Sequence, residues 1–275
     1  MTEAIFGERV EFESAARPAL EASARLWWAV TALGQWLFAA YVAAHFGPLV
    51  LREGIDGLKQ AELANGFIPG DTVGNFAVTG HILLAAFIMS AGPLQLVPQI
   101  RSRFPAFHRG LGRTYLLSVV VSAIAGLSLI WTRPLFGPLI NNIATSLDGV
   151  LIIVFAAIGV RYAIARDLSA HRRWALRLFM VASSVWFLRL GFKVWTFLTG
   201  GIGIEDKTFS GPFVYPWHFG QFLLPLAVLE LYLRARDSGS PAARLTVAAG
   251  LFVVTLLMGI GIFLMSTRTW LPRTA

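Results

Sequence analysis

The sequence has 275 residues, of which 56% are hydrophobic and only 14% are charged. Soluble domains are about 45 to 50% apolar and about 25% charged, so this composition excludes an ordinary soluble enzyme and also a disordered chain. The net charge of +8 does not indicate nucleic-acid binding, because the basic residues interrupt long apolar runs instead of gathering on a water-facing surface. The sequence contains no cysteine, which excludes disulfides, thiolate catalysis and cysteine-ligated metals.

Apolar segments long enough to cross a bilayer dominate the chain. A hydrocarbon core about 30 Å thick is spanned by roughly 20 helical residues. Seven segments reach this length, namely residues 27–45, 75–97, 111–131, 143–162, 174–197, 213–233 and 242–265. We therefore predict an all-α, polytopic transmembrane helix bundle with seven helices. It would form a single membrane domain over residues 27–265, preceded by a tail over residues 1–26 and followed by a tail over residues 266–275.

The distribution of Lys and Arg predicts the orientation of these segments. Fifteen basic residues fall in the N-terminal tail and in the connections after the second, fourth and sixth segments, whereas seven fall on the other side. Cytoplasmic loops of membrane proteins carry the excess of Lys and Arg. The N-terminus is therefore expected in the cytoplasm and the C-terminus outside. A short interfacial helix is expected around residues 54–64 of the longest external loop.

Five ionisable residues lie inside the predicted spans, toward their outer ends: His81, Asp148, Arg189, Lys193 and His218. Ionisable groups at membrane depth are costly unless they are paired or hydrated, so a cluster at one depth indicates a functional site. This cluster would suit a transporter or a small-molecule-binding membrane protein. A structural alternative is an ion pair of Asp148 with Arg189 or Lys193, in a protein whose polar residues only hold helices together.

Two further histidines, His108 and His171, occupy equivalent positions at the cytoplasmic starts of the third and fifth segments. Two neutral imidazoles on neighbouring helices are suitable axial ligands for a b-type haem. Arg109 and Arg172 or Arg173, which follow the histidines directly, would pair with the haem propionates. The alternative is that these residues interact with anionic lipid headgroups, which select His and Arg at cytoplasmic helix ends.

A second haem would need the outer histidines, His81 and His218. Two haems stacked in this way would carry electrons across the membrane. Arg113 and Arg177, with Arg109 and Arg172, would neutralise the haem propionates or an anion at a quinone site. The leading hypothesis is therefore a transmembrane electron-transfer protein. If it is an enzyme, it would be a membrane oxidoreductase with a quinone or another redox partner.

Three short motifs carry a resemblance to a known family. They are GPLQ at residues 92–95, HRGLGRTY at residues 108–115 and HRRW at residues 171–174. Over about residues 75–234 the sequence resembles a bacterial family of multi-pass membrane proteins classed as domain of unknown function 2306. The resemblance implies an inner-membrane protein and brings no established activity. The positions that it marks are His81, Gln95, His108, Arg109, Gly112, Arg113, Tyr115, His171, Arg172, Trp174, Arg177 and Arg189.

The histidine arrangement is also loosely similar to cytochrome b561-type and ferric-reductase-type bundles, in which histidine pairs on a four-helix core hold two haems. This sequence departs from that pattern, because its fourth segment carries Asp148 and no histidine. An outer haem would consequently need His218 from the sixth segment.

Overall fold

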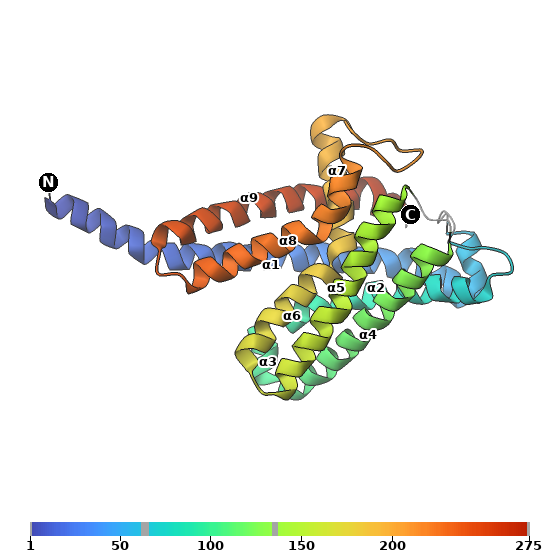
Figure 1. Cartoon of the computed structure of the whole chain (residues 1–275), viewed down its shortest axis with the longest axis horizontal. Helices are drawn as coiled ribbons and strands as arrows, with labels where there is room; N and C mark the ends of the chain where they lie inside the picture. The colour runs from blue at the N-terminus through green and yellow to red at the C-terminus, as the bar shows by residue number, and fades with distance from the viewer. Residues whose placement is uncertain (1, 62–65, 134–136, 274–275) are drawn as a thin grey trace.

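The computed structural model describes residues 2–61, 66–133 and 137–273, with side chains from residue 15 onward. Over these residues the chain is helical apart from its connections, and one isolated antiparallel bridge joins Glu205 to Ser210. The predicted all-α fold is confirmed. The helices, shown in Figure 1, are α1 (Thr2–Glu53), η1 (Gly54–Lys59), α2 (Thr72–Gln95), α3 (Pro98–Arg103), α4 (Pro105–Thr132), α5 (Leu139–Ile164), α6 (Leu168–Ala182), α7 (Ser184–Thr199), α8 (Val214–Asp237), α9 (Pro241–Met265), η2 (Ser266–Trp270) and η3 (Leu271–Arg273).

Helix α1 is far longer than the predicted first segment and runs the length of the molecule, with α9 beside it (Figure 1). The stretch expected as an N-terminal tail is helical and continuous with the apolar part. In that stretch Glu21 pairs with Arg17 and with Arg25, each at 3.3 Å and four residues away, a spacing that stabilises a helix. The expected interfacial helix after the first span is the short η1, and the end of its predicted range, residues 62–64, lies outside the described residues.

Helices α2, α4, α5 and α6 pack in chain order beside one another, and α2 also packs against α1 (Figure 1). Two indoles of α1 donate to backbone carbonyls of α2: Trp28 Nε1 to Pro93 O and Trp36 Nε1 to Ser90 O, both at 3.2 Å. These bonds fix the position of α2 against the long helix.

The predicted fifth segment is not a single helix. It breaks at Ser183, and α6 and α7 are bent by 52° relative to each other. Polar side chains from other helices reach the break: Gln35 Nε2 of α1 donates to Ser183 Oγ at 2.9 Å, and Ser184 Oγ donates to Asp148 of α5. Kinks occur where side chains enter the hydrogen-bond ladder of a helix, and two adjacent serines supply the groups here.

The described helices do not confirm the expected number of seven spans. Five are long and apolar enough to cross a membrane, or six if the bent pair of α6 and α7 counts as one span. The sixth predicted segment forms α8. This helix is long enough to cross a membrane but is not among the sufficiently apolar helices, because it carries polar residues such as His218, Gln221 and Glu230. The orientation stays a prediction.

The outward faces of the spanning helices are apolar. Leu117 and Ile124 of α4 and Leu256 of α9 each expose more than half of their surface, in the middle of long helices. Soluble monomers rarely expose contiguous patches of this kind, whereas lipid chains cover them in a bilayer.

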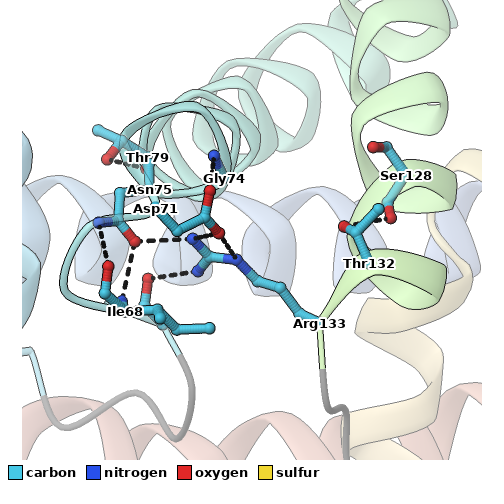
Figure 2. Close-up of polar contacts among 9 residues, drawn as sticks. Ile68, Asp71, Gly74, Asn75, Thr79, Ser128, Thr132 and Arg133 are labelled. Atoms are coloured by element: carbon cyan, nitrogen blue, oxygen red, sulfur yellow. Dashed lines mark hydrogen bonds and ion pairs between the residues drawn. The ribbon is translucent and has the colours of Figure 1, made fainter.

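A buried guanidinium joins the end of α4 to the start of α2 (Figure 2). The Arg133 side chain is only 3% exposed, and it donates to Asp71 Oδ2 through Nη2 at 2.8 Å and Nε at 3.1 Å. It also donates to Asn75 Oδ1 at 2.7 Å and to the carbonyl of Gly66 at 3.1 Å. Asp71 in turn caps α2 by accepting from the backbone N–H of Gly74 at 2.9 Å. This network fixes the ends of the two helices relative to each other.

Candidate functional site

A cavity of about 520 Å³ lies among α1, α2, α4, α5 and α7 and is bordered by the C-terminal turn. Four members of the predicted outer cluster line it, namely His81, Asp148, Arg189 and Lys193. The fifth, His218, is not among the lining residues: its ring packs behind Phe192 and Phe209, which do line the cavity, with centroid distances of 6.1 and 5.5 Å. The volume is within the range of small-molecule sites, about 300 to 1,000 Å³.

His81 is held by α4. Its Nδ1 lies 3.0 Å from the carbonyl oxygen and 3.1 Å from the hydroxyl of Ser122. Gly126, one turn along α4, allows this approach, because a Cβ atom there would lie 3.3 Å from His81 Cε1. A bond to a carbonyl assigns the proton of a neutral ring to Nδ1, so Nε2 is the acceptor atom.

Asp148 is 3% exposed and accepts a hydrogen bond from Ser184 Oγ at the break between α6 and α7. Its second oxygen, Oδ1, is buried and has no hydrogen-bond partner among the residues that the structure describes. Within that same part of the chain, no ion pair joins Asp148 to Arg189 or Lys193. The expected structural ion pair is therefore wrong, and a serine hydroxyl takes the place of the cation.

Arg189 and Lys193 lie four residues apart on α7, so both side chains are on one face of the helix. The Arg189 guanidinium lies 5.1 Å from the centroid of the Phe38 ring. Arg189 is exposed, and it lines the cavity together with Lys193. It forms no ion pair with a carboxylate in the described ranges.

The C-terminal turn, made of η2 and η3, covers one side of the cavity and contributes Thr269, Trp270 and Arg273 to its lining. Trp270 is 4% exposed, and its ring centroid lies 5.6 Å from that of Phe38 and 6.1 Å from that of Tyr41. His45 Nδ1 lies 2.9 Å from the carbonyl oxygen of Arg273. Residues 266–273, expected as part of a tail, therefore continue α9 as an ordered wall.

The inner histidines occupy equivalent positions, each as the fourth residue of its helix, His108 on α4 and His171 on α6. They are close enough to interact electrostatically. His171 Nδ1 lies 2.9 Å from the carbonyl oxygen of Gly159, whereas His108 Nδ1 is buried and has no partner in the described part of the chain. Neither histidine lines the 520 Å³ cavity, nor a second, larger apolar cavity between α1, α7, α8 and α9.

The predicted arginines around these histidines have different surroundings. Arg109, Arg113 and Arg172 are exposed. Arg177 instead donates to Glu230 of α8 at 2.7 Å and lies 4.7 Å from the Trp174 ring centroid, so a carboxylate already binds it.

Two more arginines, Arg101 and Arg173, lie near these residues. We refer to the group of His108, His171, Arg101, Arg109, Arg113, Arg172, Arg173 and Arg177 as the basic end. Arg173 pairs with Asp237 at 2.5 Å and lowers the pKa of that carboxyl. Burial, followed by the charge of Arg172, lowers the pKa of Arg101 on α3. The basic end is thus partly neutralised by α8.

Sequence reasoning missed several residues that shape the cavity, chiefly Ser122, Ser184 and Arg273. The two serines are polar residues inside apolar segments, which is a usable signal. No local signal indicates that Arg273, at the end of the chain, approaches α7.

Comparison with known proteins identifies the central part of the chain. Residues 78–209 match the model of a family described as "Predicted membrane protein (DUF2306)". This range extends from α2 to the connection before α8 and includes all four ionisable residues of the predicted cluster that line the cavity. No curated protein and no solved structure matches the chain. The resemblance of the sequence to this family is confirmed over this range, and the chain is a membrane protein with several apolar helices in a lipid bilayer.

Proposed function

We propose that this membrane protein binds a small polar molecule in the 520 Å³ cavity, as a solute-binding protein or as a transporter. The observation that carries the proposal is that His81, Asp148, Arg189 and Lys193, from three helices, line one cavity. Four ionisable groups in one cavity at membrane depth favour a site for a ligand.

A purely structural role explains this arrangement less well. Buried charges that only join helices are expected to pair with each other, because an unpaired buried charge is strongly destabilising. Asp148 and Arg189 do not form such a pair among the described residues, although both line the same cavity. A ligand that enters from outside would supply the missing partner of Arg189.

We place the protein in the bacterial inner membrane with its N-terminus in the cytoplasm. The excess of basic residues in the tail and in alternate connections supports this orientation. The cavity would then open toward the outer face, beside the ends of α1 and α9.

Reaction of single cysteines with a small thiol reagent tests the proposal, since the natural sequence has no cysteine and gives no background. Ser122→Cys places a thiol in the cavity wall. Ser118→Cys is the matched control, because it lies one turn away on the same helix, is equally exposed at 7% and does not line the cavity. We expect methyl methanethiosulfonate to modify Ser122→Cys at least about tenfold faster than Ser118→Cys. Thr145→Cys provides a second thiol in the cavity wall.

Equal, slow modification of all three variants in a folded protein would contradict an accessible cavity. Circular dichroism and gel filtration of each variant check that the protein is folded before the rates are compared.

A second candidate function is electron transfer through haem b at the basic end. Its support is the placement of His108 and His171 as neighbours at the same position of two helices. The Gly159 carbonyl fixes Nδ1 of His171, the usual second contact of a metal-binding histidine, and leaves Nε2 to ligate. The exposed Arg109 and Arg172 would hold the propionates, and a quinone or another redox partner would exchange electrons.

Visible spectra of protein expressed with added haem test this second candidate. A Soret band that is lost in His108→Ala and in His171→Ala, with both variants inserted in the membrane, would support it. A colourless protein would contradict it and would leave the cavity proposal untouched.

A further inference from the structure

We infer that the ligand of the 520 Å³ cavity is an organic anion with an apolar body, whose charged group is held by Arg189 with Lys193 and Arg273. This inference rests on the proposed function and specifies the chemistry of the ligand.

The cations that line the cavity outnumber the carboxylates. Arg189, Lys193 and Arg273 line it, whereas Asp148 is the single carboxylate among the described lining residues. Arg189 and Arg273 also lie near enough to repel each other. Such repulsion in a site of low dielectric is relieved when an anion lies between the cations.

Asp148 alone does not balance the three cations, and no ion pair joins it to Arg189 or Lys193 among the described residues. Its Oδ2 accepts from Ser184 at the helix break, and its Oδ1 is buried and has no hydrogen-bond partner among the described residues. The positive charge of the α7 face is therefore available to a ligand. A guanidinium presents paired donors that match a carboxylate or a phosphate group.

The remaining walls of the cavity are apolar and aromatic. They include Phe38, Ile82, Met89, Trp186 and Trp270. A small inorganic anion would leave these walls uncovered, whereas an aromatic or aliphatic body would bury them. The geometry thus points to an organic carboxylate or phosphate ester.

The C-terminal turn is part of this site. Arg273 comes from that turn, and Trp270 packs the turn onto Phe38, the ring over which the Arg189 guanidinium lies. The anion site is therefore incomplete without residues 266–273, and its cations come from two segments distant in sequence.

The test compares two methanethiosulfonate reagents of opposite charge on Ser122→Cys. The anionic ethylsulfonate and the cationic ethyltrimethylammonium reagents are applied separately, and each rate is divided by its rate with a free thiol in solution. We expect the anionic reagent to be favoured by at least about tenfold. Arg189→Gln in the same background should lower that ratio roughly tenfold, about 1.4 kcal/mol.

Two variants serve as controls for the charge of Arg189. Arg189→Lys keeps the charge and should keep most of the preference. Arg52→Gln removes an exposed cation at the end of α1 that does not line the cavity, and it should leave the ratio unchanged. Arg273→Gln should lower the ratio, because its charge belongs to the site.

Competing solutes then identify the source of the anion, with the protein in nanodiscs of phosphatidylcholine. Benzoate should slow the labelling of Ser122→Cys, whereas benzylamine and benzyl alcohol should not. Protection by added phosphatidylglycerol instead of benzoate would assign the same anion site to a lipid headgroup. A preference for the cationic reagent, or equal protection by benzylamine, would overturn the anion inference while the cavity stays accessible. If neither reagent labels Ser122→Cys or Thr145→Cys, the proposed function itself fails.

Discussion

The guanidinium of Arg133 lies 2.8 Å from the carboxylate of Asp71, across the short distance that separates the end of α4 from the start of α2. The arginine is almost fully buried, but 39% of the aspartate side chain is exposed. A single side chain thereby satisfies a carboxylate, an amide oxygen and a backbone carbonyl at one end of the bundle (Figure 2). The end of α4 and the start of α2 are thereby joined without a disulfide.

Removing this arginine should destabilise the protein. Arg133→Gln leaves Asp71, Asn75 and the Gly66 carbonyl without their shared donor, and bonds to charged groups contribute roughly 1.5 to 3 kcal/mol. We expect a loss of that size in the free energy of unfolding, measured by denaturant titration in detergent. Arg52→Gln, at an exposed position of the same end of the bundle, should change it little. Equal effects of the two substitutions would contradict the network.

The Asp71 carboxyl should make stability depend on pH in the acid range. The backbone N–H of Gly74 and then the Arg133 guanidinium lower its pKa below the ordinary value of 3.8. A lowered pKa in the folded state gives stability that is present above the ordinary pKa and is lost as the pH falls through the folded one. The unfolding temperature should therefore fall between about pH 5 and about pH 2.

Asp71→Asn should flatten this part of the pH profile, since it removes the titrating group. Asp206→Asn, at an exposed loop position, is the control and should leave the slope as it is. A profile that Asp71→Asn does not alter would exclude Asp71 as its source.

The bond between Ser184 and Asp148 predicts a specific energetic coupling. Ser184→Ala removes the donor to a buried carboxylate and should cost about 1 to 3 kcal/mol. When Asp148 is already replaced by Ala, Ser184→Ala should cost less free energy of unfolding than it does in the natural sequence. The effects of the two substitutions should therefore be less than additive. Asp148→Ala and Arg189→Ala should be close to additive, because no ion pair joins these described residues. Additive effects for Asp148 and Ser184, together with strong coupling between Asp148 and Arg189, would instead support the ion pair that the sequence suggested.

Close contact between α7 and α8 depends on Gly191. A Cβ atom at this position would lie 1.9 Å from Trp217 Cζ2, and Trp217 is held in place by donating Nε1 to the carbonyl of Leu188 at 3.0 Å. Gly191→Ala should therefore cost about 1 to 3 kcal/mol through overpacking. Gly159→Ala is the matched control in a helix, since an added Cβ meets no atom within 4 Å. Thermal unfolding of the two variants in one detergent checks the difference.

The spans predicted from the sequence agree with most of the helices, because span length and apolar composition are local properties. The segments 75–97, 111–131, 143–162 and 242–265 correspond to α2, α4, α5 and α9 within a few residues. The break at Ser183 was missed because it depends on Gln35 and Asp148, which lie on other helices. A hydropathy pattern contains no information about such contacts.

The candidate site was predictable in part. Ionisable residues inside apolar segments are recognisable from sequence alone, and His81, Asp148, Arg189 and Lys193 indeed line one cavity. Their partners were not predictable. The sequence suggested His218 as the counterpart of His81, but His81 bonds to Ser122, and His218 bonds to the carbonyl of Val214 in its own helix.

By itself the sequence determined that the chain is a helical membrane protein and which of its ionisable groups lie inside long apolar segments, because a bilayer requires long apolar helices with satisfied backbones. Only the tertiary structure decided which of these groups meet. Helix rotation and packing set whether two side chains face one cavity or opposite sides. For that reason the pairing of Asp148 with Ser184, and the approach of Arg273 to Arg189, follow from the fold and not from the spacing of residues along the chain.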